Sequence, residues 1–430
     1  MSRAIDGRRR PARPDPARGA AARRPGTETD EMTAISTAAA PAAHEAPRPA
    51  WGAVVAMTLC SFVLIASEFM PVALLTPIAQ DLGLTEGQAG QAISISGLSA
   101  VVTSLLVTRL IGALDRRAVL IGMALLLAAS GTLVALAPSF PVLMAGRALL
   151  GVAIGGFWSL NTVVLMRLLP AALVPLGLAI NQGGTALAST VSAPLGSYLG
   201  DLVGWRGTFF AVVPLALGAA LWQALALPPL PAGPRAQARG VLRLLGNGRL
   251  MLGMAAILLV FMGQFALFTY LRPFLERVTG VGVPALSMLL LVVGVAGLAS
   301  VALVGRVVRA GLLVAVVAMP LAMAGVALAL VPLGASVWAV AVLLGLWGLV
   351  GVAPPVAWGT WLARTLPEDA EAGGGLMVAV IQLAITLGAA GGGLVFDAFG
   401  PLANVAASAG VLALAALVAM LAARMLPRGA

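Results

Sequence analysis

The chain has 430 residues, of which 60% are hydrophobic and only 10% charged, and its mean hydropathy is strongly positive. A soluble globular protein carries about 25% charged residues, so this composition excludes an ordinary soluble protein and indicates a chain solvated mainly by lipid. A single cysteine, Cys60, and a single histidine, His44, exclude a disulfide framework and any metal cluster built from His and Cys. The formal net charge is +10, and the basic residues fall mostly in the tail and between apolar segments, which argues against nucleic-acid binding.

The first 48 residues form an amino-terminal tail that is rich in Arg, Ala and Pro. The tail lacks apolar periodicity, so we expect it to be disordered. It also lacks the apolar core of a secretory signal peptide, since none precedes Trp51. Three interpretations remain open: a flexible cytoplasmic tail, an extension upstream of a true start at Met32, or an Arg-rich contact with anionic lipids.

Apolar segments of the length that crosses a bilayer, about 20 residues, recur twelve times after the tail. They are predicted at 51–79, 88–112, 118–137, 142–166, 172–200, 207–227, 250–271, 284–305, 310–331, 337–362, 374–396 and 402–426. The predicted fold is therefore an all-α integral membrane protein. Its predicted domains are a disordered tail (1–48), a first six-helix bundle (49–227), a cytoplasmic central loop (228–248) and a second six-helix bundle (249–427).

The placement of arginine gives the orientation, because Arg and Lys are retained on the cytoplasmic side of a membrane. With the tail inside and the helices alternating in direction, the inner loops and ends hold 22 of the 26 Arg residues. The outer loops hold Arg206, Arg272 and Arg277, and Arg147 lies within a span. We therefore predict that both termini are cytoplasmic.

The two halves of the chain repeat each other at a shift of 196 residues. Glu68, in "SEF", then corresponds to Gln264, in "GQF", and "DLVG" at 201–204 corresponds to "DAFG" at 397–400. Because six is an even number of crossings, the two copies lie parallel in the membrane. Secondary carriers built from two parallel halves bind substrate near the bilayer midplane, where the halves meet.

Small residues and prolines indicate how the helices pack. Gly151 and Gly155 have the small-xxx-small spacing that allows close helix contacts in lipid. Pro194, Pro354 and Pro355 remove backbone donors inside two predicted helices, which favours bends there.

Glu68 is the only charged residue between Pro49 and Gln80. A charge at the centre of a membrane helix costs roughly 3 kcal/mol, and acids in such positions usually line pathways. Because burial disfavours the ionised form of a carboxyl group, we expect Glu68 to carry a proton at physiological pH. The alternative is a structural carboxylate that is hydrogen-bonded and never cycles.

The chain resembles transporters of the major facilitator superfamily, in the twelve-helix drug/proton antiporter branch. Within that branch it is similar to bacterial purine ribonucleoside efflux pumps. The resemblance covers about residue 48 to the end of the last span. It rests on "SEFMPVALLTPIAQDLG" (67–83), "GRALLGVAIGGFW" (146–158), "APLGSYLGDLVGWR" (193–206), "QFALFTYLRP" (264–273) and "GTWLARTLPEDAEAGGG" through "AVIQLA" (359–384).

Two superfamily motifs depart from their usual form. The loop motif between the second and third spans is "GALDRRAVL" (112–120), which lacks the usual Gly-Arg after its first bases. The antiporter motif of the fifth span is "STVSAPLGS" (189–197), with Ala193 in place of the usual Gly. The resemblance implies that the loop forms an ionic latch at the inner gate through Asp115, Arg116 and Arg117; a solvated surface pair is the alternative.

The resemblance also implies that the first and fourth spans line one cavity, where the long side chain of Arg147 approaches Glu68. A neighbouring guanidinium favours the ionised carboxylate, opposing burial. Making and breaking this contact would load a proton on one side of the membrane and release it on the other. A structural anchor of the fourth span is the alternative role of Arg147.

Uncharged polar and aromatic side chains are the expected substrate contacts, because amides pair with hydroxyls or base edges and indoles stack on flat rings. Each amide has an alternative role in helix packing, and each Trp in an interfacial belt. Apart from Arg147 no basic residue is placed to meet a phosphate within the membrane, so the expected substrate is a neutral nucleoside. The candidates are Gln264, Gln382, Asn161, Asn181, Gln182, Trp158, Tyr270 and Trp358.

The predicted function is therefore proton-coupled export of purine ribonucleosides and analogues by alternating access, by a monomer in a bacterial inner membrane. The expected partners are this substrate, protons and lipid, with no nucleic acid, cofactor or metal. One alternative is an efflux carrier for sugars or unrelated drugs. A second is a membrane-embedded enzyme or sensor, although one acid and one arginine do not make a hydrolytic set and the chain has no P-loop.

Overall fold

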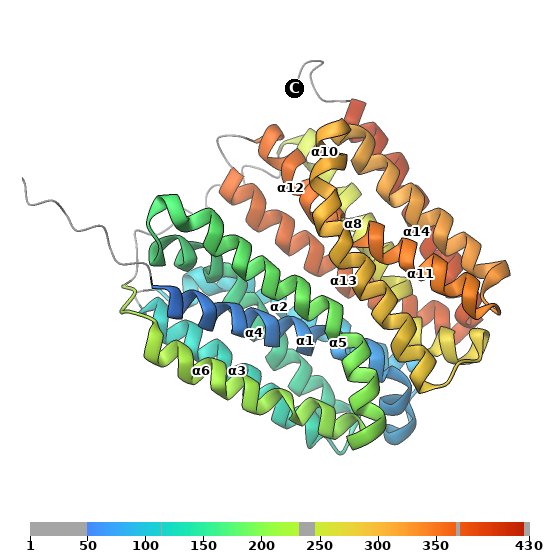
Figure 1. Ribbon diagram of the computed structural model, residues 1–430, viewed down its shortest axis with the longest axis horizontal. Helices are drawn as coiled ribbons and strands as arrows, with labels where there is room; N and C mark the ends of the chain where they lie inside the picture. Colours follow the sequence, from blue (N-terminus) through green and yellow to red (C-terminus); the bar gives the residue numbers. More distant parts are fainter. Residues whose placement is uncertain (1–49, 113, 232–245, 367–369, 425–430) are drawn as a thin grey trace, which may run out of the picture. The chain divides into compact units, whose positions relative to one another are not determined.

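The computed structural model describes residues 50–112, 114–231, 246–366 and 370–424, and every element in these ranges is helical (Figure 1). The tail, most of the central loop and the last residues lie outside the described part. The first half consists of α1 (Trp51–Leu82), α2 (Glu86–Leu110), α3 (Arg116–Ala135), α4 (Phe140–Leu168), α5 (Val174–Phe210) and α6 (Val212–Ala226). The second half consists of α8 (Gly248–Thr269), α9 (Leu271–Phe274), α10 (Val283–Leu333), α11 (Val337–Gly351), α12 (Pro354–Thr365), α13 (Ala370–Phe399) and α14 (Pro401–Arg424).

Eleven helical segments of the described chain are long and apolar enough to cross a membrane. One of them, 171–226, has 56 residues, which is more than twice the length that a bilayer needs. Its backbone turns at Gly204, where φ is 72°, a left-handed conformation that glycine adopts without strain. The segment therefore makes two crossings, and the prediction of twelve transmembrane helices in two parallel halves is confirmed.

Each half packs mainly on itself. In the first half α1 packs against α5 and α6, and α2 against α4; in the second half α8 packs against α13 and α14, and α10 against α11. One hydrophobic core belongs largely to the first half and two belong largely to the second. The halves meet where α2 packs against α13 and α5 against α10. Figure 1 colours the first half from blue to green and the second from yellow to red.

Glycines set the close approach of α4 to α2, as their spacing predicts. A Cβ atom on Gly151 would lie 2.1 Å from the carbonyl oxygen of Ser96, and one on Gly155 would lie 2.4 Å from that of Ala100. No larger side chain fits at either position without separating the helices. The two helices therefore touch along their backbones.

The predicted prolines coincide with a break in one helix but not in another. The tenth crossing breaks between α11 and α12, just before Pro354 and Pro355. In contrast, α5 continues through Pro194 without an interruption there. Two further prolines, Pro71 and Pro77, lie inside α1. These two prolines determine which backbone carbonyls of α1 are free to bind side chains in the candidate site.

Candidate functional site

Glu68 lies in α1 at the interface of the two halves and is only 4% exposed. The Nε2 amide of Gln382, on α13 of the opposite half, donates a hydrogen bond of 3.4 Å to its Oε1. The ion pairs among the described residues do not include Glu68. The buried acid of the first half therefore has a neutral partner in the second half.

Arg147 lies at the same level on α4 and is 1% exposed. Its guanidinium donates to the backbone carbonyls of Ser67 and Glu68 on α1, at 2.9 and 3.4 Å. It also donates to the carbonyl of Ala92 at 2.9 Å and to the hydroxyl of Ser96 at 3.2 Å, both on α2. Arg147 thus joins three helices of the first half, and it reaches Glu68 through the backbone and not through the carboxyl group.

Two prolines explain why α1 offers carbonyl groups to arginine side chains. A proline inside a helix has no N–H, so the carbonyl four residues before it loses its helical partner. Pro71 frees the carbonyl of Ser67, which Arg147 binds. Pro77 likewise frees the carbonyl of Ala73, which accepts a hydrogen bond from Arg272 of the second half. The positions of the prolines inside the first span are a sequence signal that indicates both free carbonyls, although not the arginines that bind them.

An aromatic cluster lies next to Glu68 and bridges the halves. The ring of Phe69 on α1 stacks on Phe265 of α8, with centroids 5.8 Å apart and an interplanar angle of 27°. Phe268 meets both rings edge-on, at 6.2 and 6.0 Å. The 196-residue shift pairs Phe69 with Phe265, so the two copies of one aromatic position touch each other.

The predicted amide contacts fall into two groups. Gln264 donates to the carbonyl of Gly351 at 3.0 Å, while its buried Oε1 has no partner among the described residues. Asn161 donates to Asn181 at 2.8 Å, and Asn181 donates to Ser61 at 2.9 Å. This second group joins α4, α5 and α1 within the first half, and only Oδ1 of Asn161 lacks a partner.

The remaining predicted contacts have mixed surroundings. Tyr270 and Trp358 are fully buried: the hydroxyl of Tyr270 donates to the carbonyl of Ala389 at 2.8 Å, and Trp358 packs edge-on against another indole. Trp158 is half-buried, and Gln182 is exposed. The structure brings Glu68, Arg147 and Gln382 together. In contrast, Trp358 is packed inside the second half, and Tyr270 lies where the second half meets α2.

The predicted gating loop lies against the end of the first half. Asp115 caps α3 by accepting from the N–H of Arg117 at 2.8 Å, and it also accepts from the N–H of Leu230 at 3.0 Å. The N–H of Arg116 donates to the carbonyl of Leu230 at 2.9 Å, and the guanidinium of Arg117 donates to that of Ala224. These partners belong to the first half or, in the case of Leu230, to the start of the central loop that follows it.

Several side chains of the two halves meet at the end of the bundle where α1 connects to α2, which we call the α1–α2 end. Here Thr76 donates to Glu276 at 2.6 Å, and Arg277 pairs with Glu86 of α2. Glu276 and Arg277 lie in a single π-helical turn, Leu275–Thr279, a feature frequent at functional sites. These side chains and Arg272 line a cavity of about 330 Å³ between the halves.

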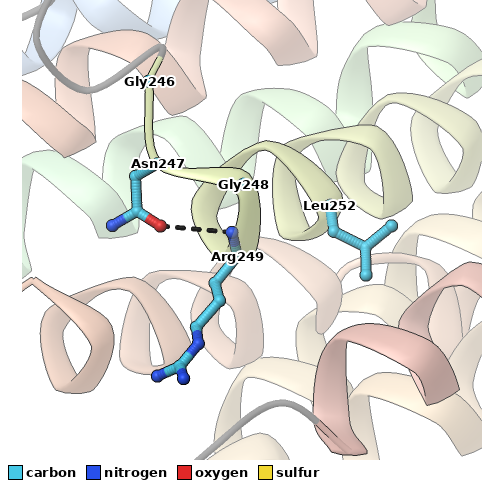
Figure 2. Close-up of a pocket in the computed structure, with 5 residues that line it drawn as sticks. All are labelled: Gly246, Asn247, Gly248, Arg249 and Leu252. Carbon is cyan, nitrogen blue, oxygen red and sulfur yellow. Dashed lines mark hydrogen bonds between the residues drawn. The ribbon is translucent and has the colours of Figure 1, made fainter.

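A second hollow, of about 720 Å³, lies at the start of α8 and includes none of the predicted site residues among its lining. Figure 2 shows Asn247 turned so that its Oδ1 accepts a hydrogen bond from the N–H of Arg249, at 3.1 Å. Asn247 also accepts from the N–H of Leu250 at 3.2 Å. This side chain is a helix cap, and we assign no transport role to the hollow.

Comparisons with known proteins agree with this architecture. The Transcription regulatory protein OpdE of Pseudomonas aeruginosa is 52% identical over 396 residues, covering 91% of this chain and 98% of the relative. The Purine ribonucleoside efflux pump NepI of Salmonella typhimurium is 42% identical over 380 residues, covering 88% and 96%.

Two solved structures share the fold at 16% sequence identity. A bacterial homologue of the human lysosomal transporter Spinster, in an inward-facing and unoccupied conformation, has a TM-score of 0.70 and covers 87% of this chain and 97% of that one. A D-xylose-proton symporter also has a TM-score of 0.70, covering 86% and 97%. The family profile described as Major Facilitator Superfamily matches residues 57–356. With twelve crossings in two parallel halves and a buried acid between them, the chain belongs to the major facilitator superfamily of transporters and is not an enzyme.

Proposed function

We propose that the chain is a proton-coupled antiporter that exports purine ribonucleosides and their analogues by alternating access. The observation that carries this proposal is the burial of the Glu68 carboxyl group at the interface, with Gln382 of the other half as its partner. The name of the 42% identical relative, a purine ribonucleoside efflux pump, supports the substrate class.

In the proposed cycle Glu68 is the proton carrier. Its carboxyl group borders both halves, so a rocking motion of the halves exposes it first to one side of the membrane and then to the other. The guanidinium of Arg147, held on the backbone of α1, favours the ionised form, and burial favours the neutral form. A change in the exposure of Glu68 therefore drives proton uptake on one side and release on the other.

In this proposal the substrate binds to uncharged polar groups of the spans. The Oε1 of Gln264 and the Oδ1 of Asn161 are buried acceptors without a partner among the described residues. A buried polar atom without a hydrogen bond is costly, and a hydroxyl or amino group of a nucleoside would satisfy each one. The buried guanidinium of Arg147 already donates four hydrogen bonds, which supports a neutral substrate over a phosphorylated one.

The proposal extends to orientation and assembly. We place the chain in a bacterial inner membrane as a monomer, with both termini in the cytoplasm, because this topology puts 22 of the 26 Arg residues inside. The α1–α2 end then faces outward, and the domain limits at 49–227 and 249–427 separate the two rocking bodies. Accessibility of single introduced cysteines from either side tests this orientation.

One specific observation favours a second candidate. The relative with 52% identity carries the name of a transcription regulatory protein, which is compatible with a membrane sensor that binds a small molecule on the same scaffold. A sensor binds without moving its ligand across the membrane. Transport by the purified protein in liposomes separates the two functions. An efflux carrier for sugars or unrelated drugs remains the alternative within the transporter class.

The experiment that tests the main proposal is accumulation of labelled inosine in inverted membrane vesicles, with and without an imposed pH gradient. We expect gradient-driven accumulation by the natural chain, and its loss in Glu68→Gln. The matched control is Asp201→Asn, which neutralises an exposed acid on α5 and should leave transport unchanged. Undiminished accumulation by Glu68→Gln would refute the coupling role, and absence of inosine movement in the natural chain would favour the sugar, drug or sensor alternative.

A further inference from the structure

Asp397, near the end of α13, binds the start of α2 in the opposite half. Its Oδ1 accepts a hydrogen bond of 2.9 Å from the N–H of Gly87, and its Oδ2 accepts one of 2.6 Å from the hydroxyl of Thr85. Thr85 and Gln88 already form a capping box, in which each side chain binds the backbone N–H of the other. The N–H of Gly87 is one of the first helix donors, which have no partner within the helix. Asp397 therefore completes the cap of a helix that belongs to the other half.

Glycine makes this approach possible. A Cβ atom on Gly87 would lie 2.2 Å from Oδ2 of Asp397 and 2.7 Å from the carbonyl oxygen of Gly393. A Cβ atom on Gly393 would lie 3.0 Å from the Cα atom of Gly87. The backbones of α2 and α13 are thus in direct contact at this point, and the carboxylate lies at the positive end of the α2 dipole.

The duplicated half contains the same acid without the same contact. Asp201 corresponds to Asp397 at the 196-residue shift and is exposed as Asp397 is, but its side chain has no hydrogen bond or ion pair with a described residue. The positions that correspond to Thr85 and Gln88 are Val281 and Pro284, and α10 begins without a side-chain cap. Valine has no hydroxyl, so this helix start has no counterpart of the Thr85 donor. The counterpart of Gly87 is Val283, whose N–H alone does not replace the pair of donors that Asp397 binds.

Hydrogen bonds between the halves are concentrated around this contact. Within the described ranges they lie at the α1–α2 end, at Glu68 with Gln382, and at Thr190 with Gly294. The opposite end, where α2 connects to α3, has no hydrogen bond between described residues of the two halves. The α1–α2 end is therefore the closed end in this conformation.

We propose that Asp397 is a positioning residue that latches the two halves together at the α1–α2 end. Opening of this end requires the carboxylate to leave the start of α2. An aspartate side chain is short, so both of its hydrogen bonds break with a small separation of α2 and α13, whereas the longer side chains of Arg272 and Arg277 can follow such a movement. The inference rests on the alternating access of the proposed function, and it does not depend on the substrate or on proton coupling.

The test measures how often the α1–α2 end opens. Ile93 of α2 is 2% exposed and packs in a core shared with the second half, so Ile93→Cys reports opening when a membrane-impermeant maleimide is added to right-side-out vesicles. In this background Asp397→Asn, which removes the charge and replaces one of the two acceptor oxygens with an amide donor, should raise the labelling rate at least about fivefold, the equilibrium change expected for loss of one hydrogen bond to a charged group. Asp201→Asn is the matched control and should change the rate less than about twofold. Gly87→Ala, whose methyl group would displace the carboxylate, should act like Asp397→Asn.

Native Cys60, which is fully buried in the first half, separates opening from unfolding. In chains with the natural Ile93, Asp397→Asn should leave Cys60 unlabelled. Equal labelling of the Asp397→Asn and Asp201→Asn chains would overturn the latch, and so would a matching rise in Cys60 labelling. Because the measurement needs neither substrate nor a pH gradient, its failure is distinguishable from failure of the transport proposal.

Discussion

Phe69 and Phe265 occupy the same position in the two duplicated halves, and their rings stack on each other across the interface, with centroids 5.8 Å apart. A position that meets its own duplicate lies on the approximate twofold axis that relates the halves. The residues that precede them are Glu68 and Gln264. The acid that we propose as the proton carrier therefore lies beside this axis, where a rocking motion changes its surroundings most directly.

The ring stack predicts an energetic coupling between the two positions. Phe69→Leu and Phe265→Leu each keep an apolar side chain but remove the aromatic contact. An aromatic pair contributes about 0.5–1.5 kcal/mol beyond buried area, so the double variant should lose less stability than the sum of the single variants by this amount. Thermal unfolding of the purified proteins in detergent measures the cycle. Strictly additive losses of stability would show that the stack contributes nothing. The control is Phe399→Leu, which changes an exposed ring and should show no coupling to Phe69→Leu.

Arg147 and Pro71 should also be coupled. Arg147→Lys replaces a planar group that reaches three helices with a single ammonium, so we expect a loss of about 2–4 kcal/mol. Pro71→Ala restores an N–H that can bind the carbonyl of Ser67, and the cost of Arg147→Lys should then fall by about 1 kcal/mol. Thermal stability of the single and double variants checks this. Pro77→Ala is the control, because the carbonyl that Pro77 frees is bound by Arg272 and not by Arg147; equal coupling to both prolines would contradict the interpretation.

The helix count and the burial of Glu68 could be predicted from the sequence, because both depend on local features. A bilayer imposes a length on each apolar segment, and a lone acid in such a segment stands out against its neighbours. The partner of Glu68 is different, since Gln382 lies 314 residues away in the chain. Nothing local to Gln382 shows which of several amides faces the acid, because that depends on how α13 packs against the first half.

The contacts at the α1–α2 end were missed for a related reason. In the sequence Asp397 stands out only as part of a repeat, and its role as a cap depends on the glycine contact between α2 and α13. Pro77 offers a free carbonyl, but only the fold brings Arg272 to it. A sequence can show that a polar group needs a partner; the identity of the partner is a property of the packed helices.

Asn181 and Gln264 should respond differently to truncation, although both were predicted substrate contacts. Asn181→Ala removes the link between Asn161 and Ser61 within the first half, so we expect a stability loss of about 1–3 kcal/mol and little change in the KM for inosine. Gln264→Ala removes an acceptor without a described partner and also the hydrogen bond to the carbonyl of Gly351, so we expect KM to rise about tenfold with a stability loss of about 1 kcal/mol. Transport kinetics and thermal stability measured on the same preparations separate the two outcomes. A raised KM for Asn181→Ala at unchanged stability would assign that residue to the substrate site.

Gly90 should be intolerant of a methyl group because Tyr270 is wedged against α2. A Cβ atom on Gly90 would lie 2.0 Å from the hydroxyl oxygen and 2.6 Å from Cζ of Tyr270, while that hydroxyl is held by the carbonyl of Ala389 on α13. Gly90→Ala should therefore cost about 1–3 kcal/mol through overpacking. Tyr270→Phe removes the nearest clashing atom and should restore part of this loss, but not all of it, since the ring carbon remains too close.

The control for Gly90 is Gly122 of α3, where an added Cβ atom would meet nothing within 4 Å. Alanine has the higher helix propensity, so Gly122→Ala should leave stability unchanged or raise it by up to about 1 kcal/mol. Thermal unfolding of the purified protein should therefore show a loss of stability for Gly90→Ala and no loss, or a gain, for Gly122→Ala. If Gly90→Ala left the stability of the protein as unchanged as Gly122→Ala does, the contact between α2 and Tyr270 would not be tight. The conclusion that the two halves approach closely at this end would then be wrong.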